Sequence, residues 1–251
     1  MIKRLIRTAI VTIVLAVVLI GAWAWWQRGQ PPKWYNPPSP SDPVVQAQAE
    51  DVEMAVAQMI TKVREPEERW GMRLTEDHVN TWLATRLHDW VDNQVDLDWP
   101  AKLQMVQMQL QPDEITVAVA FGETLDDAQV VAFAVTPDAR DGEMFTTLVS
   151  ASIGRIEFSG GSLDAMIKRL EKLNTSWDIM QILPFAQGER AIPIALDLSD
   201  DRRVTIEEVR CKEGVMDLIC RTSFPGAPTR VDDTMRDSHP AVSETSVNGP
   251  E

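Results

Sequence analysis

The longest apolar stretch of the chain lies at its N-terminus. Between residues 8 and 27 no side chain is charged, and aliphatic residues and tryptophans fill most of the positions. A helix of about 20 residues is long enough to cross the hydrocarbon core of a bilayer, which is roughly 30 Å thick. The pattern therefore predicts a transmembrane helix over residues 8–27.

Charged and aromatic residues on either side of this stretch set its predicted orientation. Residues 1–7 carry three basic side chains, which favour the cytoplasmic side of a membrane. At the other end we expect an aromatic belt with a cationic anchor at the membrane interface, formed by Trp23, Trp25, Trp26 and Arg28. The chain is thus predicted to be a single-pass protein of the cytoplasmic membrane. Its N-terminus would be cytoplasmic and its C-terminal domain extracytoplasmic, with the lipid bilayer as a partner through residues 8–27.

A second interpretation of the same stretch is a signal peptide that is cleaved after Ala24. The tripeptide Ala22-Trp23-Ala24 fits the small-x-small pattern of peptidase sites. An uncleaved signal-anchor is favoured, because the apolar run exceeds the usual signal-peptide core of about 7 to 15 residues. Both interpretations place the rest of the chain outside the cytoplasm.

Two segments flank the predicted domain. Residues 28–43 contain six prolines, which forbid a helix and favour an extended spacer of up to about 45 Å. Residues 225–251 are rich in proline, serine, glycine and acids, which predicts a disordered tail. The folded domain is therefore expected at residues 44–224, a length that suffices for one hydrophobic core.

Apolar residues spaced three and four apart predict amphipathic helices in this domain. The first covers residues 44–64 and is expected to pack on its own domain. The second begins after Thr75, whose side chain can cap it, and carries two acidic residues in its first turn. Its apolar face continues to Trp90. A later helix is expected to begin at Ser162 as its N-cap.

From residue 103 onward the apolar pattern has a period of two, which indicates strands. We expect strands at residues 103–111, 115–121, 130–136, 144–158, 192–198, 203–211 and 215–222. The first two form a hairpin, and Asp141-Gly142 marks another turn. The predicted fold class is α+β, in which an antiparallel sheet of four or more strands is packed by amphipathic helices behind the N-terminal transmembrane helix.

Two neighbouring strands have one bulky apolar face and one face of small residues. The small face carries Ala118, Ala120, Ala132 and Ala134. Because neither face is polar, both must be covered, either by helices packed on the alanines or by an apolar ligand. These four alanines are therefore the candidate apolar groove for a lipid or protein ligand.

The part predicted to be exported is strongly acidic. The first 41 residues hold five basic and no acidic residues, which leaves 38 acidic against 19 basic residues in the rest, a net charge of −19. A field of this sign disfavours nucleic acid and anionic lipid headgroups as partners. We therefore expect no nucleic-acid partner.

No residue pattern predicts a catalytic, cofactor or metal site. The sequence lacks G-x-S-x-G, Walker A and G-x-G-x-x-G. His78 and His88 are ten residues apart on one predicted helix, about 15 Å along its axis, too far to share a metal. Asp197, Asp200 and Asp201 are followed by two arginines, which predicts a neutralised polar turn rather than a calcium site.

Cys211 and Cys220 are the two cysteines of the chain. A two-residue turn at 213–214 would set Cys211 opposite Met216 and leave the two sulfurs roughly 13 Å apart. A four-residue loop at 214–217 would instead pair the cysteines directly. A disulfide and two buried free thiols are therefore both open interpretations.

The stretches Trp70–Leu87 and Ile153–Leu170 resemble the YpmS-like family of bitopic bacterial proteins and similar planctomycete envelope proteins. The matching residues are Leu74, Thr75, Asn80, Leu83, Gly154, Gly161 and Leu163. They belong to a helix with a leucine-threonine, asparagine and leucine pattern, and to a strand that leads through glycines into a helix. The resemblance implies an N-terminal anchor and an α+β domain, and it carries over no catalytic residue.

Two functions follow from these observations. The first is a membrane-anchored, non-enzymatic extracytoplasmic protein that binds an envelope component, either a lipid or a protein. The alternative is an exported enzyme, a hydrolase with a carboxylate acid/base site, because 38 acidic residues leave room for such a pair. An apolar groove would favour the first function, and a cleft that holds two carboxylates with raised pKa would favour the second.

Overall fold

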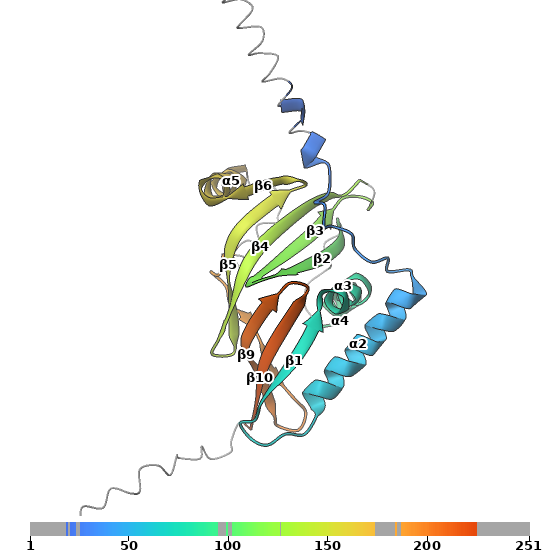
Figure 1. The fold of residues 1–251 in the computed structure, drawn as a ribbon, viewed down its shortest axis with the longest axis vertical. Coiled ribbons are helices and arrows are strands. Elements are labelled where there is room, and N and C mark those ends of the chain that lie inside the picture. The colour runs from blue at the N-terminus through green and yellow to red at the C-terminus, as the bar shows by residue number, and fades with distance from the viewer. Residues whose placement is uncertain are drawn as a thin grey trace, which may run out of the picture.

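Two antiparallel sheets form the framework of the domain (Figure 1). The computed structural model describes residues 19, 21–23, 26–94, 99, 102–125, 127–173, 184 and 187–224. The four-stranded sheet has the order β1 (Arg69–Thr75), β10 (Val215–Ser223), β9 (Arg203–Lys212) and β8 (Ala195–Asp197). The six-stranded sheet has the order β2 (Leu103–Gln111), β3 (Glu114–Phe121), β4 (Gln129–Arg140), β5 (Glu143–Ile153) and β6 (Ile156–Ser159), and β7 (Ile192–Pro193) pairs with β5. The predicted α+β class with an antiparallel sheet of four or more strands is confirmed.

Four described helices pack around these sheets. They are α2 (Pro43–Thr61), α3 (Glu76–Thr85), α4 (Leu87–Gln94) and α5 (Gly160–Leu173). Figure 1 shows α2 along one side of the domain, next to α3 and β1. It shows α5 beside β6, at the end of the domain that the N-terminal segment enters.

The predicted hairpins are confirmed, and their turns explain the local residue choice. Gln111 pairs with Glu114 across the β2–β3 turn, in which Asp113 has a φ of 60°. At the β4–β5 turn, Asp141 and Gly142 have φ of 55° and 79°. Two consecutive positive φ values match the twist of the flanking strands, and Asp-Gly adopts them at little cost.

The strand predicted over residues 144–158 is in fact two strands. β5 ends at Ile153, which pairs with Ile156 at the start of β6. Gly154 between them has a φ of 60°, a conformation that glycine adopts without the steric cost of a Cβ atom. The glycine therefore reverses the chain within what the apolar pattern alone describes as one continuous strand.

Two helix boundaries also differ from the prediction. α5 begins at Gly160, and the Ser162 hydroxyl donates to Ser159 O (2.8 Å) and accepts from Ser159 N–H (3.0 Å), so Ser162 is not the N-cap. The second helix does not run on to Trp90, because α3 ends at Thr85 with Arg86 as its C-cap and α4 follows at once.

The bulky face of the six-stranded sheet is covered by two different elements. Toward α5, Val131 and Phe133 form a buried cluster with Leu163 and Ile167 of that helix. Toward the other end, the buried residues Leu110, Ile115 and Val135 pack with Cys211 of the four-stranded sheet. The two sheets therefore share a core, and the predicted apolar face of α5 is confirmed at its two described buried positions.

The small face of the sheet is covered by the chain itself, which corrects the candidate ligand groove. Ala118, Ala120, Ala132 and Ala134 are buried, with at most 5% of their surface exposed. Trp34, Tyr35 and Ala84 of α3 pack against the buried cluster that contains Ala118, Ala120 and Ala132. Two large aromatic side chains thus occupy the space that small residues leave, and burial raises the pKa of Tyr35 to about 12.

The segment at 28–43, predicted to be a spacer, has no helix between residues 29 and 42 but lies on the domain. Asn36 N–H donates to Gln107 Oε1 (2.8 Å). Arg155 donates from its backbone to Gln27 O (3.2 Å) and from Nε to Pro31 O (3.0 Å). These bonds, with the burial of the aromatic pair, hold the segment against the sheet, so it does not extend freely away from the domain.

The predicted transmembrane helix lies mostly outside the described residues, of which it includes only 19, 21–23, 26 and 27. Among the described residues, no helix is both long and apolar enough to cross a membrane. Trp23 and Trp26 are 60% and 57% exposed. Trp25 and the predicted tail at residues 225–251 also lie outside the described residues.

Candidate functional site

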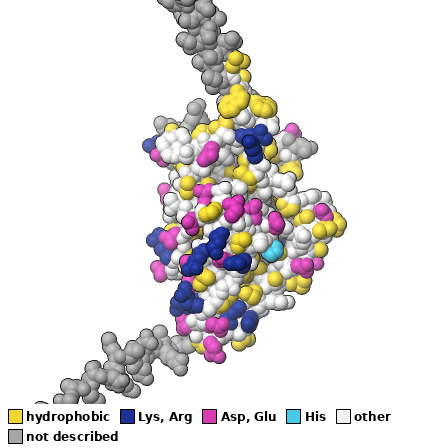
Figure 2. All heavy atoms as spheres, viewed as in Figure 1, with side chains coloured by type: hydrophobic (Ala, Val, Ile, Leu, Met, Phe, Trp, Pro, Cys, Tyr) yellow, Lys and Arg dark blue, Asp and Glu magenta, His cyan; other side chains and the backbone are white. Residues whose placement is uncertain are grey.

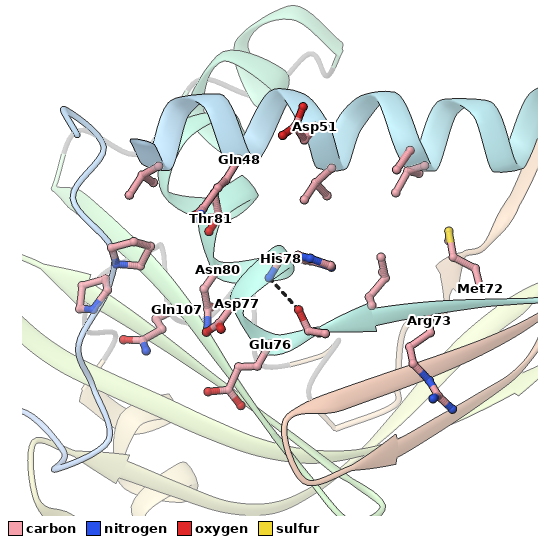
Figure 3. Close-up of a pocket in the computed structure, with 18 of the residues that line it drawn as sticks. Gln48, Asp51, Met72, Arg73, Glu76, Asp77, His78, Asn80, Thr81 and Gln107 are labelled. Atoms are coloured by element: carbon pink, nitrogen blue, oxygen red, sulfur yellow. Dashed lines mark hydrogen bonds between the residues drawn. The ribbon is translucent and has the colours of Figure 1, made fainter. Parts of the chain in front are cut away.

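A groove of about 1060 Å³ lies between α2 on one side and β1 with the start of α3 on the other (Figure 3). Residues 34–38 close one end of it. The groove does not include the four alanines of the predicted site. Its lining residues come from the predicted spacer, from the first two predicted helices, from the predicted strand that contains Gln107, and from β1, which was not predicted.

The C-terminus of α2 is fixed by a buried arginine. The Arg202 guanidinium donates to Lys62 O (2.8 Å) and Thr61 O (2.9 Å), and its Nε donates to Asp200 (2.8 Å). Its side chain is only 5% exposed. Lys62 O also accepts from Arg64 Nη1 (3.1 Å). These bonds satisfy carbonyls at the helix end, and α2 ends at Thr61, short of the predicted residue 64.

The middle of α2 rests on α3 rather than on β1. Ala49 is fully buried, and the small side chain allows close approach of the helices. Trp82 Nε1 donates to Glu53 of α2 (3.1 Å), and Arg86 lies within ion-pair distance of Glu50 and Glu53. α2 is thus held away from β1, and the groove is the space left between them.

The start of α3 is fastened to the edge strand β2. Thr75 Oγ1 accepts from His78 N–H (3.2 Å), which confirms the predicted N-cap. Glu76 Oε2 accepts from Leu110 N–H (2.7 Å). The Asn80 side chain donates to Met108 O and accepts from Met108 N–H, both at 2.7 Å. The helix therefore supplies hydrogen bonds that a neighbouring strand would otherwise make.

β1 forms the floor of the groove and is an edge strand. It pairs with β10, and among the described residues no strand lies along its other edge. Figure 3 shows Met72 pointing to the side of α2 and Arg73 pointing away from it. Alternation along the strand thus gives the groove apolar side chains and leaves the charged ones on the opposite face.

That opposite face carries a set of ion pairs. Arg73 donates to both carboxylate oxygens of Asp217, at 2.6 and 3.0 Å, and Lys212 binds the same carboxylate at 3.2 Å. These partners lower the pKa of Asp217 to about 2. Figure 2 shows basic and acidic side chains mixed over this side of the molecule. Arg73 is therefore already neutralised where it borders the groove.

The groove has an apolar part and an acidic part. Its apolar lining residues are Trp34, Pro37, Pro38, Val45, Val52, Ala55, Val56, Met59, Met72 and Leu74. Its acidic lining residues are Asp51, Glu76 and Asp77. Glu76 is used by Leu110 N–H, whereas Asp51 and Asp77 have no ion-pair or hydrogen-bond partner in the described part of the chain. Figure 3 shows Asp77 at the start of α3, near Asn80, and Asp51 on the side of α2 that faces away from β1.

Apart from His78, which lines the groove, the residues considered for metal or redox chemistry lie elsewhere. Asp197 and Asp200 are paired with Arg203 and Arg202, as predicted. Within the described ranges, no group of three potential metal ligands comes together. These residues do not line the groove.

The cysteines are free and buried. Cys211 lies opposite Met216, as a two-residue turn requires, and Cys220 lies opposite Ile206 because a bulge after Ile219 shifts the register. Burial raises the pKa of both thiols to about 11, which keeps them protonated and unreactive. The free-thiol interpretation is thus the one that the structure supports.

The groove was not predicted from the sequence, because β1 was not among the predicted strands. The signal was present in Arg69–Thr75, where Trp70, Met72 and Leu74 alternate with charged or small residues. Residues 34–38, which close one end of the groove, have no such local signal. Their position depends on the packing of Trp34 and Tyr35 against the alanine face of the sheet.

No protein-family model, no curated protein and no solved structure matches this chain. The resemblance to the YpmS-like family therefore stays a prediction.

Proposed function

We propose that the chain is a single-pass, membrane-anchored extracytoplasmic protein that binds an envelope component, a lipid or a protein, in the groove between α2 and β1. The observation that carries the proposal is the apolar lining of this groove. Apolar side chains that face a hollow of several hundred ångströms cubed, with a few polar groups at one end, are typical of ligand sites.

The supporting residues face the groove from both walls. Val52, Val56 and Met59 extend from α2, and Met72 and Leu74 from β1. A helix normally closes on the strand below it and buries such residues in the core. Here the contact of α2 with α3 keeps the two walls apart, so a ligand that fills the groove would gain the burial that the fold leaves unused.

The N-terminal residues support membrane attachment. Trp23 and Trp26 are more than half exposed, and exposed tryptophans of this kind are favoured at a membrane interface, where the ring is partly desolvated. The orientation follows from the basic residues at 1–7, as the positive-inside preference expects.

Photo-crosslinking in membranes tests binding. A photoreactive amino acid at Met59, in the groove, is expected to give an adduct with one envelope component. The matched control is Met54 on the same helix, which is 54% exposed and does not line the groove. Equal adducts at both positions, or none at Met59, would contradict the proposal.

The anchor is tested separately by the mature N-terminus. We expect the chain in the membrane fraction to retain residues before Ala24, with its domain accessible only from outside the cytoplasm. A mature chain that begins at Trp25 and is recovered in the soluble fraction would show that the segment is a cleaved signal peptide.

A further inference from the structure

We propose that the ligand of the groove is an extended polypeptide segment, which adds to the free edge of β1 as a new antiparallel strand. The inference rests on the proposed function, since it names the partner of the same groove. A strand that enters between a helix and a sheet edge gains main-chain hydrogen bonds from the edge and specificity from alternate side chains.

The hydrogen-bond pattern of β1 leaves backbone groups for such a strand. Glu76 N–H donates to Gly214 O (2.9 Å), and Thr222 N–H donates to Glu68 O (3.2 Å). Bonded residues alternate in an antiparallel ladder, so the even-numbered residues of β1 face β10. The backbone N–H and C=O groups that point to the free edge therefore belong to Arg69, Gly71 and Arg73, together with the N–H of Thr75, whose C=O is used by α3.

The geometry also fixes which side chains of the added strand face the groove. Residues on the same face as Met72 and Leu74 would contact Val56 and Met59 of α2, so apolar residues are expected there. The alternate residues would lie on the face of Arg73, toward solvent. A lipid would fill the apolar part of the groove but has no row of N–H groups to pair with the edge of β1. A polypeptide would use both the apolar lining and the backbone groups of this edge.

Charge complementarity sets the direction of the segment. Asp77 lines the groove from the first turn of α3, next to the end of β1, and has no cationic partner in the described part of the chain. An antiparallel strand would start beside the end of β1 and hence near Asp77. We therefore expect a segment that begins with a basic residue and continues with apolar residues at every second position.

A defined peptide tests this arrangement on the full-length chain in lipid nanodiscs. The probe is Lys-Thr-Val-Thr-Val-Thr-Val, blocked at both ends, with the 7-residue length of β1. Its valines would face α2, and its threonines would turn their N–H groups to β1. Methylation of the threonine nitrogens is expected to weaken binding at least about tenfold, because each removes a hydrogen-bond donor.

The matched control is the same peptide methylated at its valine nitrogens, which point away from β1 and should bind within about twofold of the parent. Equal loss from both methylated peptides would overturn strand addition. Replacing the lysine by glutamate should weaken binding severalfold at low salt, and the difference should shrink as salt increases. A glutamate peptide that binds as well as the parent would contradict the assigned direction.

Variants of the protein locate the peptide. Met59→Arg should abolish peptide binding, whereas Met54→Arg on the outer face of α2 should leave it unchanged. Failure of the peptide to bind, while the photoreactive group at Met59 still captures an envelope component, would overturn the strand-addition inference and leave the proposed function intact. A captured lipid would have the same consequence, and loss of both signals would overturn both.

Discussion

Asn80 of α3 and Met108 of β2 exchange two hydrogen bonds, from Asn80 Nδ2 to Met108 O and from Met108 N–H to Asn80 Oδ1, each 2.7 Å long. The side-chain amide thus copies the donor and acceptor of a peptide group. It covers part of the outer edge of β2, which would otherwise be open to pairing with another chain. Asn80 is 6% exposed, so water does not replace these bonds.

Asn80→Ala is expected to lower the free energy of unfolding by about 2 to 4 kcal/mol, because two buried backbone groups of Met108 lose their partners. Asn80→Asp should also destabilise, since it sets a carboxylate oxygen against Met108 O. Thermal and urea denaturation measure both effects. The control is Asn93→Ala on exposed α4, where only a bond to Asp89 O is lost, and it should cost less than about 0.5 kcal/mol. Equal losses at Asn80 and Asn93 would contradict the edge-capping role.

Gly154→Ala is expected to release the segment at 28–43 from the domain. Gly154 has a φ of 60°, and a methyl group there would overlap the carbonyl oxygen of Arg28. Hydrogen exchange at Arg155 N–H, which donates to Gln27 O, should become faster, and the segment should become protease-sensitive. Gly161→Ala meets nothing within 4 Å and should leave both measurements unchanged. Protection that persists at Arg155 would show that the segment is not held at this point.

Alkaline stability should depend on the two buried thiols. Their pKa is about 11 in the folded protein, against an ordinary value of 9.0. An acid whose pKa rises on folding stays protonated longer in the native state, so its contribution to stability is complete below pH 9 and is lost as the pH rises through 11. The double variant Cys211→Ala, Cys220→Ala should lose less stability over this range, as read from urea midpoints. Parallel curves for both proteins would contradict this account.

Acid stability should depend on Asp217. Its pKa is lowered from 3.8 to about 2, mainly by the hydrogen bond from Arg73. A carboxyl whose pKa falls on folding stabilises the native state above the ordinary value, and this contribution is lost as the pH falls through 2. Asp217→Asn should therefore flatten the decline in stability between pH 4 and 2. Arg73→Gln, which removes the main partner, should flatten it as well. If stability declines as steeply between pH 4 and 2 in both variants as in the unchanged protein, this ion pair is not the source of the decline.

Sequence patterns correctly predicted the elements that are determined by residues close together in the sequence. Thr75 caps a helix because its own side chain reaches His78 N–H, and the β2–β3 hairpin follows from alternation and a turn at Asp113. The register of Cys211 followed from a two-residue turn in the same way. These features need only neighbours in sequence, so the pattern suffices to predict them.

The features that were not predicted correctly depend on contacts between residues that are distant in sequence. The alanine face predicted that something must cover it, but not that Trp34 and Tyr35 of the same chain would do so. The groove likewise depends on Arg202, about 140 residues from the helix end that it holds. Ser162 had the right residue type for a cap, yet the chain already turns at Gly160. Of the two walls of the candidate site, the helix α2 could therefore be predicted from the sequence, whereas β1 and the position of α2 beside it were not predicted.

Hydrogen bonds of Gln27, Pro31 and Asn36 to the domain restrict the motion of the N-terminal segment relative to the globular part. With residues 8–27 in a bilayer, as proposed, the groove would stay at one height and one tilt above the lipid surface. A domain on a flexible linker would instead sample many positions. A partner would have to arrive at that height. Encounter would then be a search in two dimensions, with a rate set by lateral diffusion along the membrane rather than by the reach of a tether.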